Sequence, residues 1–129
     1  MADYLLDANH ASPLVTLSHP LRQLVLQALE TNYTFSICVP VLTETLYGIG
    51  ILPRAKQNLA EWARLKPSIL CYVPDEDDAR FAAELQLSLR RRGWQLETVD
   101  ALALRYDLTL LTSDNDFQAV PELKLENWL

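Results

Sequence analysis

The stretch Leu108-Thr-Leu-Leu-Thr-Ser-Asp114 decides the fold class. Its first five residues are all leucine or threonine, without the apolar–polar alternation of a strand that has one face in water. Such a run predicts a strand buried on both faces, which is typical of parallel sheets covered by helices on both sides. If this is correct, the rest of the chain must supply further short strands and the helices that connect them.

The remaining sequence meets this requirement. Similar apolar runs predict strands at residues 4–6, 34–39 and 69–73, and an edge strand at 123–125. Helical spacing of apolar residues, with opening prolines and closing cap residues, predicts helices at 20–30, 40–51, 53–67, 74–92 and 99–106. Strands that alternate with helices predict an α/β fold: a single domain over residues 1–129 with a parallel β-sheet sandwiched by α-helices in three layers.

Composition and charge exclude several classes of protein. The chain has 129 residues, half of them hydrophobic, which argues against intrinsic disorder. Its 17 acids and 11 bases give a formal net charge of −6, which excludes a basic protein that binds nucleic acid by neutralising phosphates. Cys38 and Cys71 lie in apolar runs without metal-type spacing and are expected to be buried free thiols. With no basic-then-apolar leader and no long apolar run, we expect a soluble cytoplasmic protein with no membrane segment.

Five acids fall where one edge of the predicted sheet should lie. Asp7 follows the first strand, and Asp114 follows the 108–112 strand with Asp116 close by. Asp100 begins a helix, and Glu44 lies one turn into the helix after the second strand. Right-handed crossovers bring the carboxyl ends of parallel strands to one edge, where ligands usually bind. The sequence therefore predicts that these acids gather there.

Each acid also has a purely structural interpretation. Asp7 and Asp114 can cap helices or shape turns, and Asp100 can be a first-turn acid favoured by the helix dipole. Glu44 fits such an interpretation less well, because it falls on a partly apolar flank of its helix. The main core face of that helix is predicted to hold Val41, Leu42, Leu46 and Ile49.

Carboxylates that crowd together repel one another unless a cation is present. Mg²⁺ and Mn²⁺ suit such a site because they prefer oxygen ligands and keep several waters. A metal held in this way can activate water and stabilise the oxygens of an in-line phosphodiester displacement. Without a metal, such acids repel the phosphates of a nucleic acid. With a metal bound between them, they can hold the ion that contacts the phosphate.

The sequence resembles a known family, the PIN domain, and specifically the VapC-type toxins. The resemblance runs through the whole chain in order and rests on four segments and the ending, at residues 5–9, 42–48, 99–102, 110–117 and 125–128. It implies a Mg²⁺- or Mn²⁺-dependent endoribonuclease, the toxin of a type II toxin–antitoxin pair. It also implies a homodimer, an RNA substrate and a small antitoxin that wraps the toxin and blocks its site.

The resemblance also implies roles for individual residues. The catalytic acids that hold the metal would be Asp7, Glu44, Asp100 and Asp114. Asp116 would be an accessory ligand or a neighbouring acid behind the ligands. Asn9 and Thr112 would support the site through hydrogen bonds.

The segment between Asp100 and Asp114 is about one helical turn shorter than in VapC-type relatives. A helix of eight residues spans about 12 Å, whereas a strand of five residues spans about 16 Å. Asp107 also stands where a helix-ending glycine is expected. Either the fold absorbs the shorter segment, or the relative position of Asp100 and Asp114 changes.

Two other functions remain open on the sequence. One is a PIN-fold binding module with a degraded active site, acting through protein partners. The other is a phosphatase or phosphotransferase with Asp7 as nucleophile, against which Asn9 stands where a second acid is usual. His10 lacks metal-type spacing but is near enough to Asp7 in sequence to contact a phosphate, and the basic run 90–92 is expected to be a solvated helix end.

Overall fold

The computed structural model of the chain describes residues 3–93, 98–114 and 122–129. The helices and strands are, in order, β1 (Asp3–Leu6), α1 (Ala8–Ala11), the 3₁₀ helix η1 (Ser12–Val15), α2 (Pro20–Glu30), β2 (Thr34–Cys38), α3 (Val39–Gly50), α4 (Ala55–Leu65), the 3₁₀ helix η2 (Lys66–Ser68), β3 (Leu70–Tyr72), α5 (Glu76–Arg90), α6 (Thr98–Arg105), β4 (Thr109–Leu111) and β5 (Leu125–Glu126).

The five strands of the described residues form one parallel sheet in the order β3-β2-β1-β4-β5, which confirms the predicted sheet type. β1 is central and is paired on one side with β2 and on the other with β4. The chain adds β2 and then β3 on one side of β1 before it crosses to place β4 on the other side. The direction of strand addition therefore reverses between β1 and β4.

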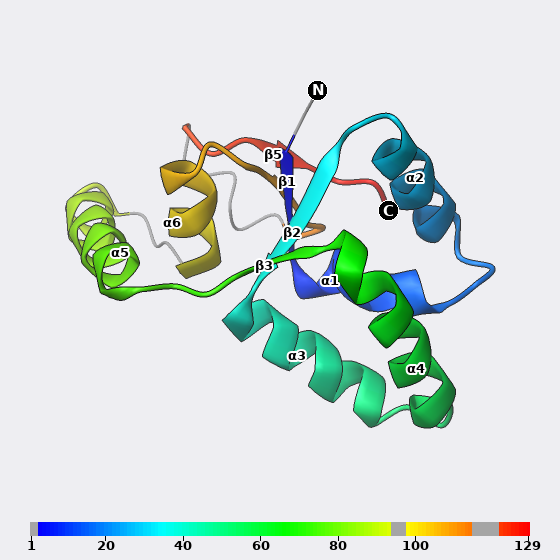
Figure 1. Cartoon of the computed structure of the whole chain (residues 1–129). Helices are drawn as coiled ribbons and strands as arrows, with labels where there is room; N and C mark the ends of the chain where they lie inside the picture. The colour runs from blue at the N-terminus through cyan, green and yellow to red at the C-terminus, as the bar shows by residue number, and fades with distance from the viewer. Residues whose placement is uncertain (1–2, 94–97, 115–121) are drawn as a thin grey trace.

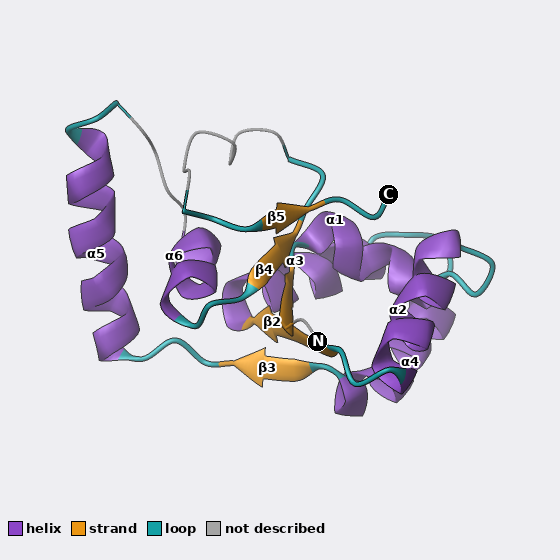
Figure 2. Cartoon of the chain, turned by 90° about the horizontal axis from the view of Figure 1, so that it is seen from above, coloured by secondary structure: helices purple, strands orange, loops and turns teal. Residues whose placement is uncertain are grey.

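This reversal puts the helices in two layers. Figures 1 and 2 both show α1, α2 and α4 on one side of the sheet and α5 and α6 on the other, with α5 outside α6. Right-handed crossovers in opposite directions require opposite faces of the sheet. The predicted three-layer arrangement is confirmed. Within the described residues, no helix is both long and apolar enough to cross a membrane.

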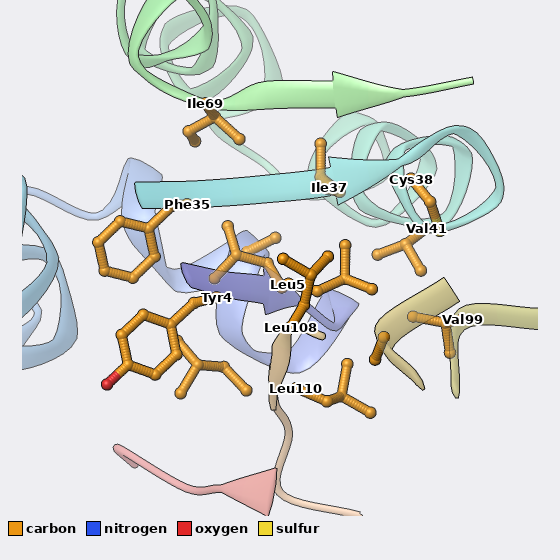
Figure 3. Packing of buried hydrophobic residues seen from close by; sticks show 14 of the residues in the cluster. Tyr4, Leu5, Phe35, Ile37, Cys38, Val41, Ile69, Val99, Leu108 and Leu110 are labelled. Atoms are coloured by element: carbon orange, nitrogen blue, oxygen red, sulfur yellow. The ribbon is translucent and has the colours of Figure 1, made fainter. Parts of the chain in front are cut away.

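The core lies against the central strands. Leu5 of β1 and Leu110 of β4 are fully buried, and Figure 3 shows both within the packed cluster. The rings of Tyr4 and Phe35, from paired positions of β1 and β2, stack with centroids 5.3 Å apart. The continuous apolar composition of these strands reflects burial on both faces.

Several local predictions need correction. Leu46 was predicted on the core face of α3 but is 38% exposed, and Thr45 is buried in its place. Burial of Thr45 is tolerated because its hydroxyl donates to the carbonyl oxygen of Val41 at 2.8 Å. Cys38 is buried as predicted, whereas Cys71 is only partly buried; both thiols are free. The short helices α1 and η1 were not predicted at all.

The fold absorbs the short segment before Asp114. β4 has three residues where five were predicted, so it spans about 10 Å, close to the roughly 12 Å of the eight-residue α6. Asp107 ends the helix in the left-handed conformation, with φ of 54°, and so does what a glycine usually does there. A shorter strand and one left-handed residue thus replace the missing turn.

Candidate active site

The candidate site lies at the carboxyl ends of β1 and β4. These are the two strands between which the direction of strand addition reverses, and parallel sheets commonly bind ligands at that point. The backbone continues the pairing beyond β1, because the Asp7 N–H donates to the carbonyl oxygen of Leu111 at 3.0 Å. Residues 7 and 112 are therefore neighbours although 105 positions separate them.

Asp7 is half-buried and has both structural and site-building contacts. It is the N-cap of α1, and its Oδ1 accepts a hydrogen bond from the Ala8 N–H at 2.8 Å. Its interpretation as a helix cap is thus correct. Oδ2 accepts from the Thr112 hydroxyl at 2.8 Å and from Asn9 Nδ2 at 3.4 Å. Three donors from two strand ends therefore fix the orientation of this carboxylate.

Asn9 and Thr112 connect the two strand ends. Asn9 Nδ2 lies 3.3 Å from Thr112 Oγ1, and Asn9 Oδ1 accepts from the Ser113 N–H at 3.2 Å. Thr112 Oγ1 also accepts from the Asp114 N–H at 3.1 Å. The hydrogen-bonded group that joins Asp7 to the Asp114 backbone is called the strand-end network below and consists of Asp7, Asn9, Thr112, Ser113 and Asp114.

Two other predicted site residues, Asp100 and Glu44, lie on the helices α6 and α3. Asp100 is in the first turn of α6 and has no exposed surface, whereas Glu44 is on an exposed part of α3. Asp116 lies outside the described residues. In residues 3–93, 98–114 and 122–129, no three Asp, Glu, His or Cys side chains are grouped as ligands of one metal ion. A site shared by all these acids therefore stays a prediction.

The donor chemistry of the strand-end network nevertheless suits a hard cation. Asp7 is partly accessible and Asp114 is exposed, so both can offer carboxylate oxygens to solvent. Mg²⁺ is commonly bound through only one or two carboxylates and keeps several waters. The carboxylates of Asp7 and Asp114 are therefore chemically suited to a hydrated hard cation.

His10 was predicted to be near enough to contact a phosphate, and this prediction is wrong. The side chain is fully buried and bonded through both ring nitrogens. Nδ1 lies 2.7 Å from Asn9 Oδ1, and Nε2 accepts from the Trp128 N–H at 3.0 Å. No local pattern signals this arrangement, because Trp128 lies 118 positions away in the sequence.

Known structures resemble this chain over nearly its whole length. VapBC2 from Rickettsia felis, bound to a DNA fragment from their promoter, is 23% identical with a TM-score of 0.81, over 98% of this chain and 99% of that one. DNA-bound VapBC from Salmonella typhimurium is 19% identical with a TM-score of 0.77, over the full length of both chains. Mycobacterium tuberculosis VapC20, a sarcin–ricin loop cleaving toxin, is 16% identical with a TM-score of 0.62, over 92% of this chain and 95% of that one.

At these identities the structural likeness concerns the fold. No curated protein is significantly similar to the chain in sequence. The family model of the PIN domain, however, matches residues 4–123, which include all of β1 but its first residue, β2 through β4 and the complete strand-end network. The chain belongs to the PIN domain family.

Proposed function

We propose that this protein is an endoribonuclease that hydrolyses phosphodiester bonds of RNA with Mg²⁺ or Mn²⁺. The observation that carries the proposal is the strand-end network, in which the Thr112 hydroxyl donates to Asp7 and accepts from the Asp114 backbone. It puts two carboxylate-bearing segments side by side at the point of the sheet where ligands commonly bind. A divalent metal bound there supplies an activated water and neutralises charge on the phosphodiester.

The chain's own residues divide this work. Asp7 and Asp114 are proposed as the ligands that offer oxygens to solvent, and Asn9 and Thr112 keep the Asp7 carboxylate in one orientation. Glu44, Asp100 and Asp116 are proposed to complete the acidic site when metal and RNA are bound. The phosphotransferase alternative needs a second acid beside Asp7, and the amide of Asn9 provides no titratable proton there.

We further propose that the nuclease is the toxin of a type II toxin–antitoxin pair and acts in the cytoplasm. The similar VapBC structures and the similarity to a sarcin–ricin loop cleaving toxin support this role. A small antitoxin is the proposed partner, and a homodimer is the proposed assembly.

The test is metal-dependent cleavage of RNA by the purified chain. Cleavage is expected with Mg²⁺ or Mn²⁺, and excess EDTA should abolish it. Asp7→Asn is expected to remove activity and to weaken Mn²⁺ binding in calorimetry, because the amide offers one neutral oxygen in place of a carboxylate. Asp3→Asn is a matched control, since Asp3 is exposed at the opposite end of the same strand.

Cleavage that persists in EDTA would exclude the metal-dependent mechanism. Wild-type protein that neither binds Mn²⁺ nor cleaves RNA would instead favour the PIN-fold binding module. Two observations on the described structure support this second function. Glu44 is exposed, and Asp100 is fully buried.

A further inference from the structure

His10 is buried and has no direct role in the proposed reaction. It lies in the four-residue helix α1, three positions after Asp7, and has no exposed surface. Its ring joins two segments from opposite ends of the chain. Nδ1 contacts Asn9 Oδ1 at 2.7 Å, and Nε2 contacts the backbone nitrogen of Trp128 at 3.0 Å.

These two partners assign the protonation of the ring. A backbone N–H can only donate, so Nε2 must present its lone pair to Trp128. The ring is then neutral, carries its proton on Nδ1 and donates it to Asn9 Oδ1. Burial lowers the pKa of His10, which favours the neutral ring, although the negative charge of Asp7 acts in the opposite direction.

The ring in turn assigns the orientation of the Asn9 amide. Because Nδ1–H requires an acceptor, Asn9 must turn Oδ1 toward His10, and the Ser113 N–H donates to the same oxygen at 3.2 Å. The NH₂ group of Asn9 is then directed to Asp7 Oδ2 and Thr112 Oγ1. With the amide reversed, an oxygen would face the Asp7 carboxylate and both contacts would be lost.

The C-terminal segment that supplies the first donor is itself firmly held. The Trp128 indole packs edge-on against Tyr4 and Phe35, with ring centroids 5.0 and 5.8 Å away. Its Nε1 donates to Glu126 Oε1 at 3.1 Å, and the Glu126 carbonyl oxygen accepts from the Thr112 N–H at 3.1 Å. The backbone N–H of Trp128 therefore has a defined position relative to both the sheet and the strand-end network.

We propose that His10 is a positioning residue, through which the backbone of the C-terminal segment Glu126–Trp128 sets the orientation of Asn9 and hence the hydrogen bonds to Asp7. The effect on catalysis rests on the proposed nuclease function. The coupling of tail, ring and amide does not.

The first test is the tautomer of His10, measured by ¹H–¹⁵N correlation NMR of the imidazole nitrogens. His19 provides an internal reference, because its Nδ1 accepts from the Leu21 N–H at 3.1 Å and it should carry its proton on Nε2 when neutral. The chain has only these two histidines. At pH 8, His10 should show a protonated Nδ1 and an unprotonated Nε2. A proton on Nε2 of His10 would overturn the proposal.

The second test isolates the tail's N–H group. Trp128→Ala and Trp128→Pro both remove the indole, but only the proline variant removes the backbone donor. The alanine variant should keep the protonated Nδ1 of His10, whereas the proline variant should show Nε2–H as well. Equal spectra from two folded variants would contradict control by the tail.

The third test measures activity in two variants that each keep one half of the ring's contacts. His10→Asn places an NH₂ near the position of Nδ1 and loses the tail contact, whereas His10→Gln offers an oxygen near Nε2 and loses the donor to Asn9. His10→Gln should lower kcat for RNA cleavage by about 10-fold or more with little change in KM. His10→Asn keeps a donor to Asn9 but loses the tail contact, so its kcat should fall less than that of His10→Gln at a comparable melting temperature.

Loss of activity that follows melting temperature in both variants would make His10 merely structural and overturn the positioning role. If the wild-type protein cleaves no RNA, the proposed function fails, while the two NMR tests still decide whether the tail controls the ring. If cleavage is robust but the His10 tautomer is wrong, only the present inference fails.

Discussion

The hydroxyl of Thr112 forms hydrogen bonds with three residues, Asp7, Asn9 and Asp114. It donates to Asp7 Oδ2 at 2.8 Å and accepts from the Asp114 N–H at 3.1 Å, so it sets the relative position of two proposed metal ligands. Thr112→Val keeps the shape of the side chain and removes these two bonds together with the one from Asn9 Nδ2 at 3.3 Å. We expect Mn²⁺ affinity or RNA cleavage to fall by about 10-fold or more, and the free energy of unfolding to fall by only about 1 kcal/mol.

Calorimetry with Mn²⁺, RNA cleavage and urea unfolding together measure this prediction. Thr109→Val is the matched control, because the Thr109 hydroxyl makes no hydrogen bond within the described part of the chain. A loss of stability without a loss of metal binding would show that Thr112 only supports the fold.

At the residue scale, the sequence predicted where the site residues lie in the fold better than it predicted how deeply they are buried. Asp7 follows from its place at a strand end, Asn9 and Thr112 follow from the family resemblance, and the structure joins the three by hydrogen bonds. The full burial of Asp100 and His10 was not predictable, because it depends on segments that are distant in sequence. Helical spacing describes one element, whereas burial also depends on what packs over it.

The connection between α6 and β4 depends on Asp107 in the left-handed conformation. This conformation is unfavourable for residues with a Cβ atom, although Asp tolerates it better than most. Asp107→Gly should therefore raise the free energy of unfolding by about 0.5–1 kcal/mol. The lost ion pair with Lys124 is exposed and is worth less than about 1 kcal/mol.

Asp107→Ala provides the contrast, because it loses the same ion pair and retains a Cβ atom. It should lower the free energy of unfolding by about 1 kcal/mol. Urea unfolding of the three proteins measures both changes. A glycine variant no more stable than the alanine variant would show that the left-handed residue costs nothing here.

Asp78 joins α5 to α6 and should make stability depend on pH. Its Oδ1 accepts from the Tyr106 hydroxyl at 2.8 Å and lies 3.0 Å from Arg105 Nη1. The hydrogen bond from the Asp75 N–H, with help from Tyr106 and Arg105, lowers the pKa of Asp78 although burial opposes this. The carboxylate therefore contributes stability above its unfolded pKa of about 4, and this contribution is lost as the pH falls through the lower folded value.

Asp78→Asn tests this dependence. The variant should be less stable than wild type at pH 7, and the difference should shrink as the pH falls from about 5 toward 2. Asp77→Asn is the control, because Asp77 is exposed on the same turn and pairs only with Arg80 in the described residues. A difference between Asp78→Asn and wild type that is constant over this pH range would contradict the ionic role of Asp78.

At the element scale, a prediction succeeded where the signals for a helix or strand lie within the segment itself. The prediction of α2 at residues 20–30 matches its observed bounds, because Pro20 can begin a helix and apolar residues recur with its period. β4 is shorter than its apolar run, because hydrogen-bonding partners rather than composition define the length of a strand. α1 has only four residues, too few for any helical period to appear.

At the scale of the whole molecule, the sequence predicted the sheet type but not the strand order. Buried runs separated by helices imply a parallel sheet, yet they are compatible with several positions for each strand. The position of β1 between β2 and β4 is a property of the assembled sheet. That position places Asp7 beside Thr112, so the strand order explains the site better than any single motif does.

The net charge of −6 makes a prediction for the complete molecule. A protein that neutralises phosphates loses affinity steeply between about 50 and 200 mM salt. An acidic protein that meets RNA through a bound metal gains from screening of its own repulsion, because salt shortens the reach of exposed charges to about 10 Å or less. We expect KM for a short RNA to stay level or fall over this salt range when Mn²⁺ is saturating.

Steady-state kinetics at several NaCl concentrations measure this dependence, and the double variant Arg90→Gln/Arg91→Gln is the control. Both arginines are exposed at the end of α5. If they are an ordinary solvated helix end, removing them should leave the dependence of KM on NaCl concentration unchanged. A KM that rises steeply with salt, and no longer does so in the double variant, would show that this basic run attracts RNA. The acids would then act only at the site, and the arginines would govern the approach of the substrate.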